Sequence, residues 1–106
     1  MIPVAPSEFG FASDDESLVY LRCIIEEMMR RFGITREECI GRINQAWSHW
    51  PSVTGDYELY RKKPGYWAHD VMFGHNSFWR LSETERKRQG MGPLQRKPYP
   101  DAPAAL

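Results

Sequence analysis

The sequence has few cysteines, no long apolar run and no signal-like leader. Its two cysteines, Cys23 and Cys39, stand within helix-like apolar patterns, where cysteine behaves as a small hydrophobe. We therefore expect free thiols, and a disulfide between Cys23 and Cys39 is the alternative. No apolar run approaches the ~18 residues of a membrane span, and the first residues lack the basic and apolar regions of a signal peptide. These absences predict a cytoplasmic protein without a membrane partner.

Motifs for catalysis and for metal binding are also missing. The chain has no Gly-rich phosphate loop, no Gly-x-Ser-x-Gly elbow and no Cys-x-x-Cys pair. The dipeptide His69-Asp70 is of the kind that phosphohydrolases use, but His69 and His75 are not at a helical ligand spacing. We therefore predict no enzyme, no metal and no cofactor. A pocket built from His69 and Asp70 with His49 or Asp56 stays open as an alternative.

Aromatic residues and an uneven charge distribution are what the chain does have. Aromatics make up 13% of the 106 residues and include four Trp, which gives a single small domain large side chains for its core. Residues 1–58 carry ten acids and five arginines, a net charge of −5, whereas residues 59–106 carry nine bases and four acids, a net charge of +5. Either the two halves attract each other, or the basic half meets an acidic partner.

A first amphipathic helix is predicted to begin near Ser13. Ser13 and Glu16 have the spacing of a capping box, and Gly33 suits the residue after the helix. The apolar residues between them recur with helical period and spread beyond one face. This pattern predicts a central helix that is covered on two sides.

A second helix is predicted between Thr35 and Pro51. Thr35 and Glu38 again have capping-box spacing, and a proline ends a helix because the preceding residue is pushed away from the α region. Trp47 and Trp50 both belong to its apolar stripe. A glycine in a helix interior costs about 1 kcal/mol, so Gly41 predicts a close approach of the first helix.

The turn Phe32-Gly33-Ile34-Thr35 resembles the centre of a helix-turn-helix DNA reader. The resemblance covers residues 24–43 and implies that the second helix would lie on DNA. Glu37 and Glu38 stand at the end that would face phosphates, which opposes DNA binding. A plain helical hairpin explains the same residues. The alternative hypothesis is therefore a nucleic-acid-binding regulator of helix-turn-helix type, or of winged-helix type if residues 57–73 form a β-hairpin. Its candidate base-reading residues are Arg36, Arg42, Asn44 and Gln45.

The second half of the chain is less clearly patterned. Residues 64–73 fit a helix that begins at Pro64 or a strand, and we favour the helix because Ala68, His69, Asp70 and Met72 are weak strand formers. Residues 57–60 and 78–79 are predicted as short strands that pair. Ser82 and Glu85 predict a last, charged helix that Gly90 ends.

The predicted fold is therefore a mainly α, small single domain built on an antiparallel helix pair. A short third helix completes it, with a small two-stranded ribbon as an option. Residues 1–12 would form an extended N-terminal arm, residues 13–90 the globular helical domain, and residues 91–106 a flexible Pro-rich tail.

A non-enzymatic protein-protein interaction module is the function that we expect. It would be a bacterial accessory protein of immunity or antitoxin type that binds another protein through charged and aromatic surface, since Trp, Tyr and Arg are enriched at interface anchors. Stacking of single-stranded nucleic acid on the basic-aromatic stretch 59–99 is a further option, which core roles for its tryptophans would remove. The candidate partner-binding residues are Glu26, Glu27, Glu37, Glu38, Trp50, Tyr60, Trp67 and Trp79.

Overall fold

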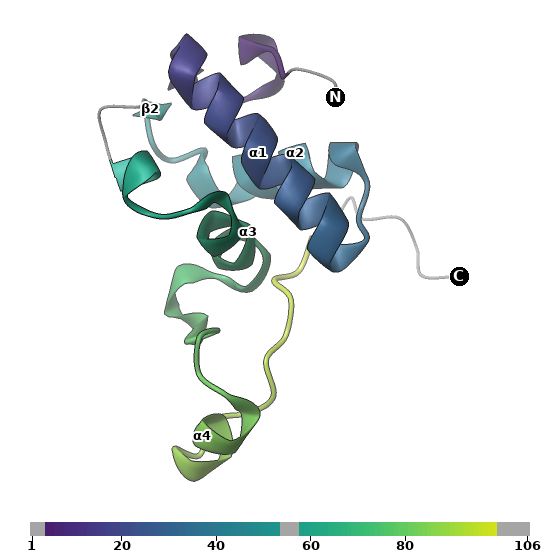
Figure 1. The fold of residues 1–106 in the computed structure, drawn as a ribbon, viewed down its shortest axis with the longest axis vertical. Coiled ribbons are helices and arrows are strands. Elements are labelled where there is room, and N and C mark those ends of the chain that lie inside the picture. Colours follow the sequence, from purple (N-terminus) through teal and green to yellow (C-terminus); the bar gives the residue numbers. More distant parts are fainter. Residues whose placement is uncertain (1–3, 54–57, 100–106) are drawn as a thin grey trace.

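The computed structural model describes residues 4–53 and 58–99 and is mainly helical, as predicted (Figure 1). Its α-helices are α1 (Asp15–Phe32), α2 (Arg36–Trp47), α3 (Pro64–Phe73) and α4 (Glu83–Arg88). Short 3-10 helices and strands connect them: η1 (Pro6–Glu8), β1 (Ala12–Ser13), β2 (Ser52–Val53), η2 (Glu58–Arg61) and η3 (His75–Ser77). None of the described helices is long and apolar enough to cross a membrane.

The central helix is α1, which packs on α2 and more extensively on α3. It begins one residue later than expected, because Asp14 and not Ser13 is the N-cap. Asp14 Oδ1 accepts a hydrogen bond from the Ser17 amide at 2.8 Å, and Ser17 Oγ accepts one from the Asp14 amide at 3.0 Å. Ser13 belongs to β1 instead. Gly33 ends the helix with a φ of +65°, which favours glycine.

The start of α2 follows the prediction in part. Thr35 Oγ1 accepts a hydrogen bond from the Glu38 amide at 3.1 Å, but the Glu38 carboxylate turns away to Arg42 instead of completing a capping box. The helix ends at Trp47. The prediction that Trp50 continues its stripe was therefore wrong.

The two-stranded ribbon lies elsewhere than predicted. β1 pairs with β2 in parallel, with Ala12 opposite Ser52 and Ser13 opposite Val53. Residues 58–61 form η2 instead of a strand, and position 57 lies outside the described residues. Residues 78–79 form a turn, in which Phe78 has a φ of +55°. Alternation over a few residues failed here because such short segments carry too little periodicity to identify a strand.

The predicted helix over residues 64–73 is confirmed as α3. Its buried face includes Trp67, Ala68, Val71 and Met72. The indole Nε1 of Trp67 donates a hydrogen bond to the Leu59 carbonyl at 2.8 Å, which ties η2 to this helix. The last predicted helix is also present, as α4, and Ser82 Oγ caps it by accepting from the Glu85 amide at 3.1 Å.

Burial divides the described chain into two parts. We call residues 4–73 the body, because the buried apolar side chains all lie between Val4 and Met72. We call residues 74–92 the lobe; Figure 1 shows its helix α4 apart from α1, α2 and α3. Within the described lobe, Arg86 is the residue that is buried. The return segment, residues 93–99, runs from the lobe back to the body.

Candidate functional site

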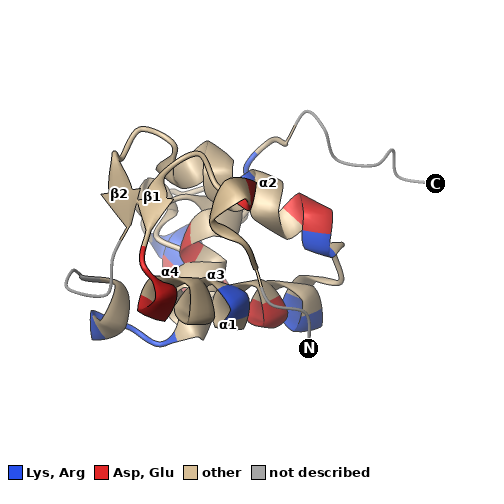
Figure 2. Ribbon diagram, turned by 90° about the horizontal axis from the view of Figure 1, so that it is seen from above, with Lys and Arg blue, Asp and Glu red and all other residues tan. Residues whose placement is uncertain are grey.

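The acidic residues that were predicted to bind a partner lie among basic neighbours. Glu27 pairs with Arg30 at 2.6 Å and with Arg31 at 2.7 Å, and these hydrogen bonds, Arg31 first, lower the pKa of Glu27. Figure 2 shows acidic and basic residues interspersed along α1. Glu26 is half-buried and Glu37 is exposed. The charge of Glu27 is therefore matched by two arginines of its own helix.

Glu38 forms a buried ion pair with Arg42. Its Oε2 lies 2.7 Å from Nε of Arg42, and both side chains are less than a tenth exposed. Arg42 also donates from Nη1 to the Lys97 carbonyl at 2.8 Å. A buried pair whose donors are satisfied is costly to break from one side. Glu38 therefore has a structural role in this fold, and its contact with a partner stays a prediction.

The N-terminal arm contacts Arg36 and Asn44, which are two of the residues proposed to read bases. Arg36 Nη1 lies 2.8 Å from Glu8 Oε1, and this guanidinium is the main cause that lowers the pKa of Glu8. Asn44 donates to the Glu8 carbonyl at 3.0 Å and accepts from the Gly10 amide at 2.7 Å. Both side chains of α2 therefore hold the arm against the body.

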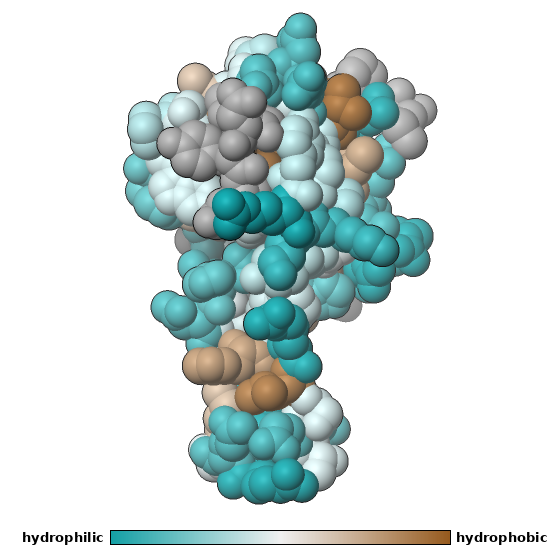
Figure 3. Space-filling view, turned by 60° about the vertical axis from the view of Figure 1, so that its left-hand side comes forward, coloured by the Kyte–Doolittle hydropathy of each residue, from teal (hydrophilic) through white to brown (hydrophobic). Residues whose placement is uncertain are grey.

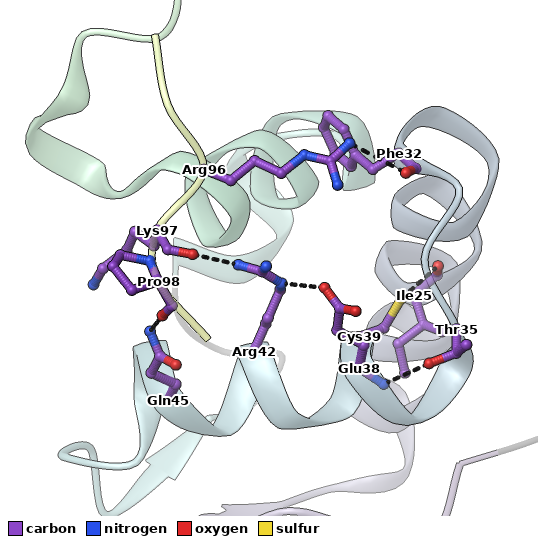
Figure 4. Close-up of polar contacts among 10 residues, drawn as sticks. All are labelled: Ile25, Phe32, Thr35, Glu38, Cys39, Arg42, Gln45, Arg96, Lys97 and Pro98. Atoms are coloured by element: carbon purple, nitrogen blue, oxygen red, sulfur yellow. Dashed lines mark hydrogen bonds and ion pairs between the residues drawn. The ribbon is translucent and has the colours of Figure 1, made fainter. Parts of the chain in front are cut away.

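The return segment contacts the other two proposed base-reading residues, Arg42 and Gln45 (Figure 4). Besides the Arg42 contact with Lys97, Gln45 Nε2 donates to the Pro98 carbonyl at 3.0 Å. The Arg42 guanidinium also lies over the Tyr99 ring, 5.3 Å from its centroid. Reading DNA with α2 would require these contacts and those of the arm to break.

The Tyr99 ring also explains the glycine inside α2. A Cβ added at Gly41 would overlap the Tyr99 hydroxyl oxygen. The close approach that the sequence predicted is therefore real, but it comes from the return segment and not from α1. Composition predicted residues 91–106 as flexible; that flexibility stays a prediction, and residues 100–106 lie outside the described part.

The histidines and aspartates do not form a metal-binding cluster in the described chain. His69 Nδ1 contacts the Gly65 carbonyl at 2.7 Å, and its ring stacks on Trp79. Asp70 Oδ1 instead lies 3.3 Å from both His75 Nδ1 and Trp79 Nε1. No group of three possible metal ligands comes together among the described residues, which exclude position 56.

A pocket of about 390 Å³ opens where the end of α2 meets β2, η2 and α3. Three indoles form its walls. The Trp47 ring stacks on Trp50, with centroids 5.7 Å apart, and meets Trp67 edge-on at 5.8 Å. Trp47 and Trp67 are buried, whereas Trp50 is 41% exposed. The other lining residues are Pro51, Ser52, Val53 and Leu59.

The pocket uses some of the predicted aromatic residues and not others. Trp50 and Trp67 line it. Tyr60 lies outside it, exposed, with its ring edge-on to Tyr20 at 4.9 Å. Trp79 packs between Tyr66 and His69 on another part of α3. Trp50 and Trp67 were therefore selected from the sequence because they are aromatic, without knowledge of the pocket that they line.

The remaining walls were missed because they come together only in the tertiary structure. Val53 and Leu59 are buried on either side of the undescribed residues 54–57. Pro51 was read as a helix terminator and Trp47 as core. The sequence Trp-x-x-Trp-Pro at the end of a helix was the available signal, since it places two indoles three residues apart where the chain leaves the helix.

Comparison with known proteins gives this chain no relative. No protein-family model matches it, and no curated protein or solved structure matches it significantly. What can be said of its function therefore depends on the geometry of its own residues.

Proposed function

We propose that this protein is a non-enzymatic interaction module that accepts an apolar side chain of a partner protein in the tryptophan pocket. One observation carries this proposal: Trp50 is 41% exposed although it stacks on a buried indole at the mouth of an open cavity. Interface anchors are enriched in Trp, and a concave, mostly apolar pocket is where a partner side chain gains most by burial.

The chemistry of the walls selects the group that fits. No charged residue is among the described lining residues, and the Trp67 Nε1 hydrogen is already donated to Leu59. The described lining therefore offers mainly apolar area, with the Ser52 hydroxyl as its aliphatic polar side-chain group. Burial of a Leu, Met or Phe side chain there is worth about 1.5–3 kcal/mol. A charged side chain would lose its hydration without gaining a counter-charge.

The cellular role that goes with such a module is that of a small accessory protein. We place it in the immunity or antitoxin class of the bacterial cytoplasm, where one domain acts by holding a partner. Both cysteines, Cys23 and Cys39, are free thiols, which supports a reducing compartment. The partner is another protein, and the function needs no cofactor.

Selection of displayed random peptides with the intact protein tests this proposal. The expected result is a set of peptides that share one apolar anchor position and bind more weakly to Trp50→Ala by about tenfold or more. Val19→Ala is the matched control, because Val19 is an exposed apolar residue that does not line the pocket. Its binding should equal that of the unchanged protein.

Two results would contradict the proposal. One is the absence of any enriched peptide under conditions where the protein is folded by circular dichroism. The other is a set of peptides whose affinity changes equally in Trp50→Ala and Val19→Ala, which would show that the pocket is not the contact.

A further inference from the structure

Phe78 in the lobe has a backbone conformation and an exposure that its residue type does not favour. Its φ of +55° and ψ of +40° place it in the left-handed region, which bulky residues rarely adopt. Its side chain is nevertheless 59% exposed, so burial does not account for its presence. Residues that break a local rule without a packing gain are expected at functional positions.

The strained turn is held in place by Arg86. Its Nη1 donates to the Ser77 carbonyl at 2.7 Å and to the Phe78 carbonyl at 3.2 Å. Its Nε donates to the Gly92 carbonyl at 3.0 Å, which closes the two ends of the lobe. Arg86 is buried and pairs with no carboxylate of the described chain. The buried guanidinium of Arg86 therefore fixes the turn that carries Phe78.

Two basic residues lie close to Phe78 in the chain or at the start of the lobe. Arg80 follows Phe78 by two residues, and its guanidinium lies 5.8 Å from the Tyr66 ring centroid without a carboxylate partner in the described chain. Lys97, whose stem approaches Gly74 at the start of the lobe, also lacks such a partner.

The acids of the lobe do not cancel this charge. Glu85 pairs with Arg88 at 2.9 Å, and Glu83 lies 3.9 Å from the Lys87 ammonium. These pairs leave Arg80 and Lys97 without a carboxylate partner in the described chain. Figure 3 shows apolar atoms, in brown and tan, gathered between the hydrophilic end of the lobe and the body.

We propose that the lobe docks an acidic, amphipathic segment of a partner protein, with Phe78 as the apolar anchor and Arg80 and Lys97 facing its carboxylates. This surface lies outside the tryptophan pocket and is a second contact beyond the proposed function. An acidic protein segment fits better than nucleic acid, because Phe78 is the one strongly exposed large apolar side chain in the described lobe, whereas strand binding uses a series of stacking rings.

Fluorescence anisotropy with a labelled peptide of repeating Glu-Glu-Leu-Glu tests this proposal on the full chain. We expect binding at about 50 mM salt that weakens as salt rises. Phe78→Gly should weaken it by about tenfold or more, and Arg80→Gln should weaken it and reduce its salt dependence. Glycine keeps the left-handed turn, so the lobe stays folded in the first variant.

The controls separate this surface from the pocket. Trp50→Ala and Val19→Ala should bind the acidic peptide as the unchanged protein does, and a Gln-Gln-Leu-Gln peptide should bind more weakly. Four outcomes would overturn the proposal: no binding of the acidic peptide, loss of its binding in Trp50→Ala but not in Phe78→Gly, tighter binding of oligothymidine of equal length, or a homodimer that Phe78→Gly dissociates.

Discussion

Buried apolar side chains of α1, α2 and α3 hold the body together. In the described lobe the one buried side chain is that of Arg86, which holds the turn by hydrogen bonds, while Trp79 and His75 contact α3 from the side of the lobe. Apolar burial is non-directional and adds up over many side chains. The bonds of Arg86 each have one geometry, and a hydrogen bond to a charged group contributes only about 1.5–3 kcal/mol. The lobe should therefore open locally at a lower free energy than the body. It can present Phe78 in a strained turn because no core depends on that residue.

Truncating a phenylalanine of the body should have the largest effect. Phe11 is 5% exposed and packs on Phe9, with centroids 5.2 Å apart, and on Trp47. Phe11→Ala leaves a cavity and should lower the free energy of unfolding by about 3–5 kcal/mol. Urea denaturation followed by Trp fluorescence measures it. A loss below about 1 kcal/mol would show that residues 4–13 are not part of the core, which would break the division into body and lobe.

Removing the arginine of the lobe should have a smaller and local effect. Arg86→Met keeps an apolar stem but leaves the carbonyls of Ser77 and Gly92 without their donor, and should lower the opening free energy of the lobe by about 1.5–3 kcal/mol. Hydrogen exchange of the Leu81 and Gln89 amides measures it.

Arg88→Met is the matched control for that variant. Arg88 lies on the same helix, is exposed and pairs only with Glu85 of the described residues, so its loss should cost at most about 1 kcal/mol. Equal effects of the two variants, or a loss of body stability in Arg86→Met, would contradict the assigned role of Arg86.

Alkaline pH should act on the body and spare the lobe. Burial in the core raises the pKa of the Cys39 thiol to about 12. An unfolded thiol has a pKa of about 8.5. Below that pH the thiol is protonated in both states, so the buried Cys39 thiol contributes its full share to the free energy of unfolding. This contribution falls by up to about 1.4 kcal/mol per unit as pH rises towards the folded value. Urea denaturation at neutral and alkaline pH should show a steeper fall for the unchanged protein than for Cys39→Ala.

The same pH change gives a check on independence. Exchange of the Leu81 amide, corrected for the intrinsic rate, should lack the Cys39-dependent fall, because the lobe can open while the thiol of Cys39 stays buried. A parallel fall would mean that lobe and body unfold together.

Replacing the exposed phenylalanine should have the smallest effect on stability. A left-handed conformation costs a non-glycine residue roughly 1–2 kcal/mol, while glycine adds freedom to the unfolded chain worth about 0.4–1 kcal/mol. Phe78→Gly should therefore leave the free energy of unfolding unchanged or raise it by up to about 1.6 kcal/mol. Thermal and urea denaturation measure it, and a loss comparable to that of Phe11→Ala would show that the ring is structural.

Features with partners close in the sequence could be predicted. Thr35 and Ser82 cap their helices through amides three residues away, and Gly33 ends α1, so local spacing was enough. The first cap was misplaced by one residue because Ser13 and Asp14 are both good cap residues. Pro64 and the weak strand formers after it correctly favoured a helix.

Features with distant partners could not be predicted. Gly41 indicated a close approach but not that Tyr99 makes it, and nothing in the sequence paired β1 with β2. Trp50 and Trp67 were chosen for their chemistry, but the pocket between them needs α2 and α3 in place. The strained turn at Phe78 was missed because an arginine eight residues later imposes it.

Native-state hydrogen exchange of the unchanged protein over a series of low urea concentrations tests the difference between body and lobe most directly. The Ile24 and Ile25 amides of α1 should exchange through global unfolding, with a free energy that falls steeply with urea. The Leu81 and Gln89 amides of the lobe should exchange at a lower free energy that hardly changes with urea. One common free energy and one common slope for all four amides would contradict the account.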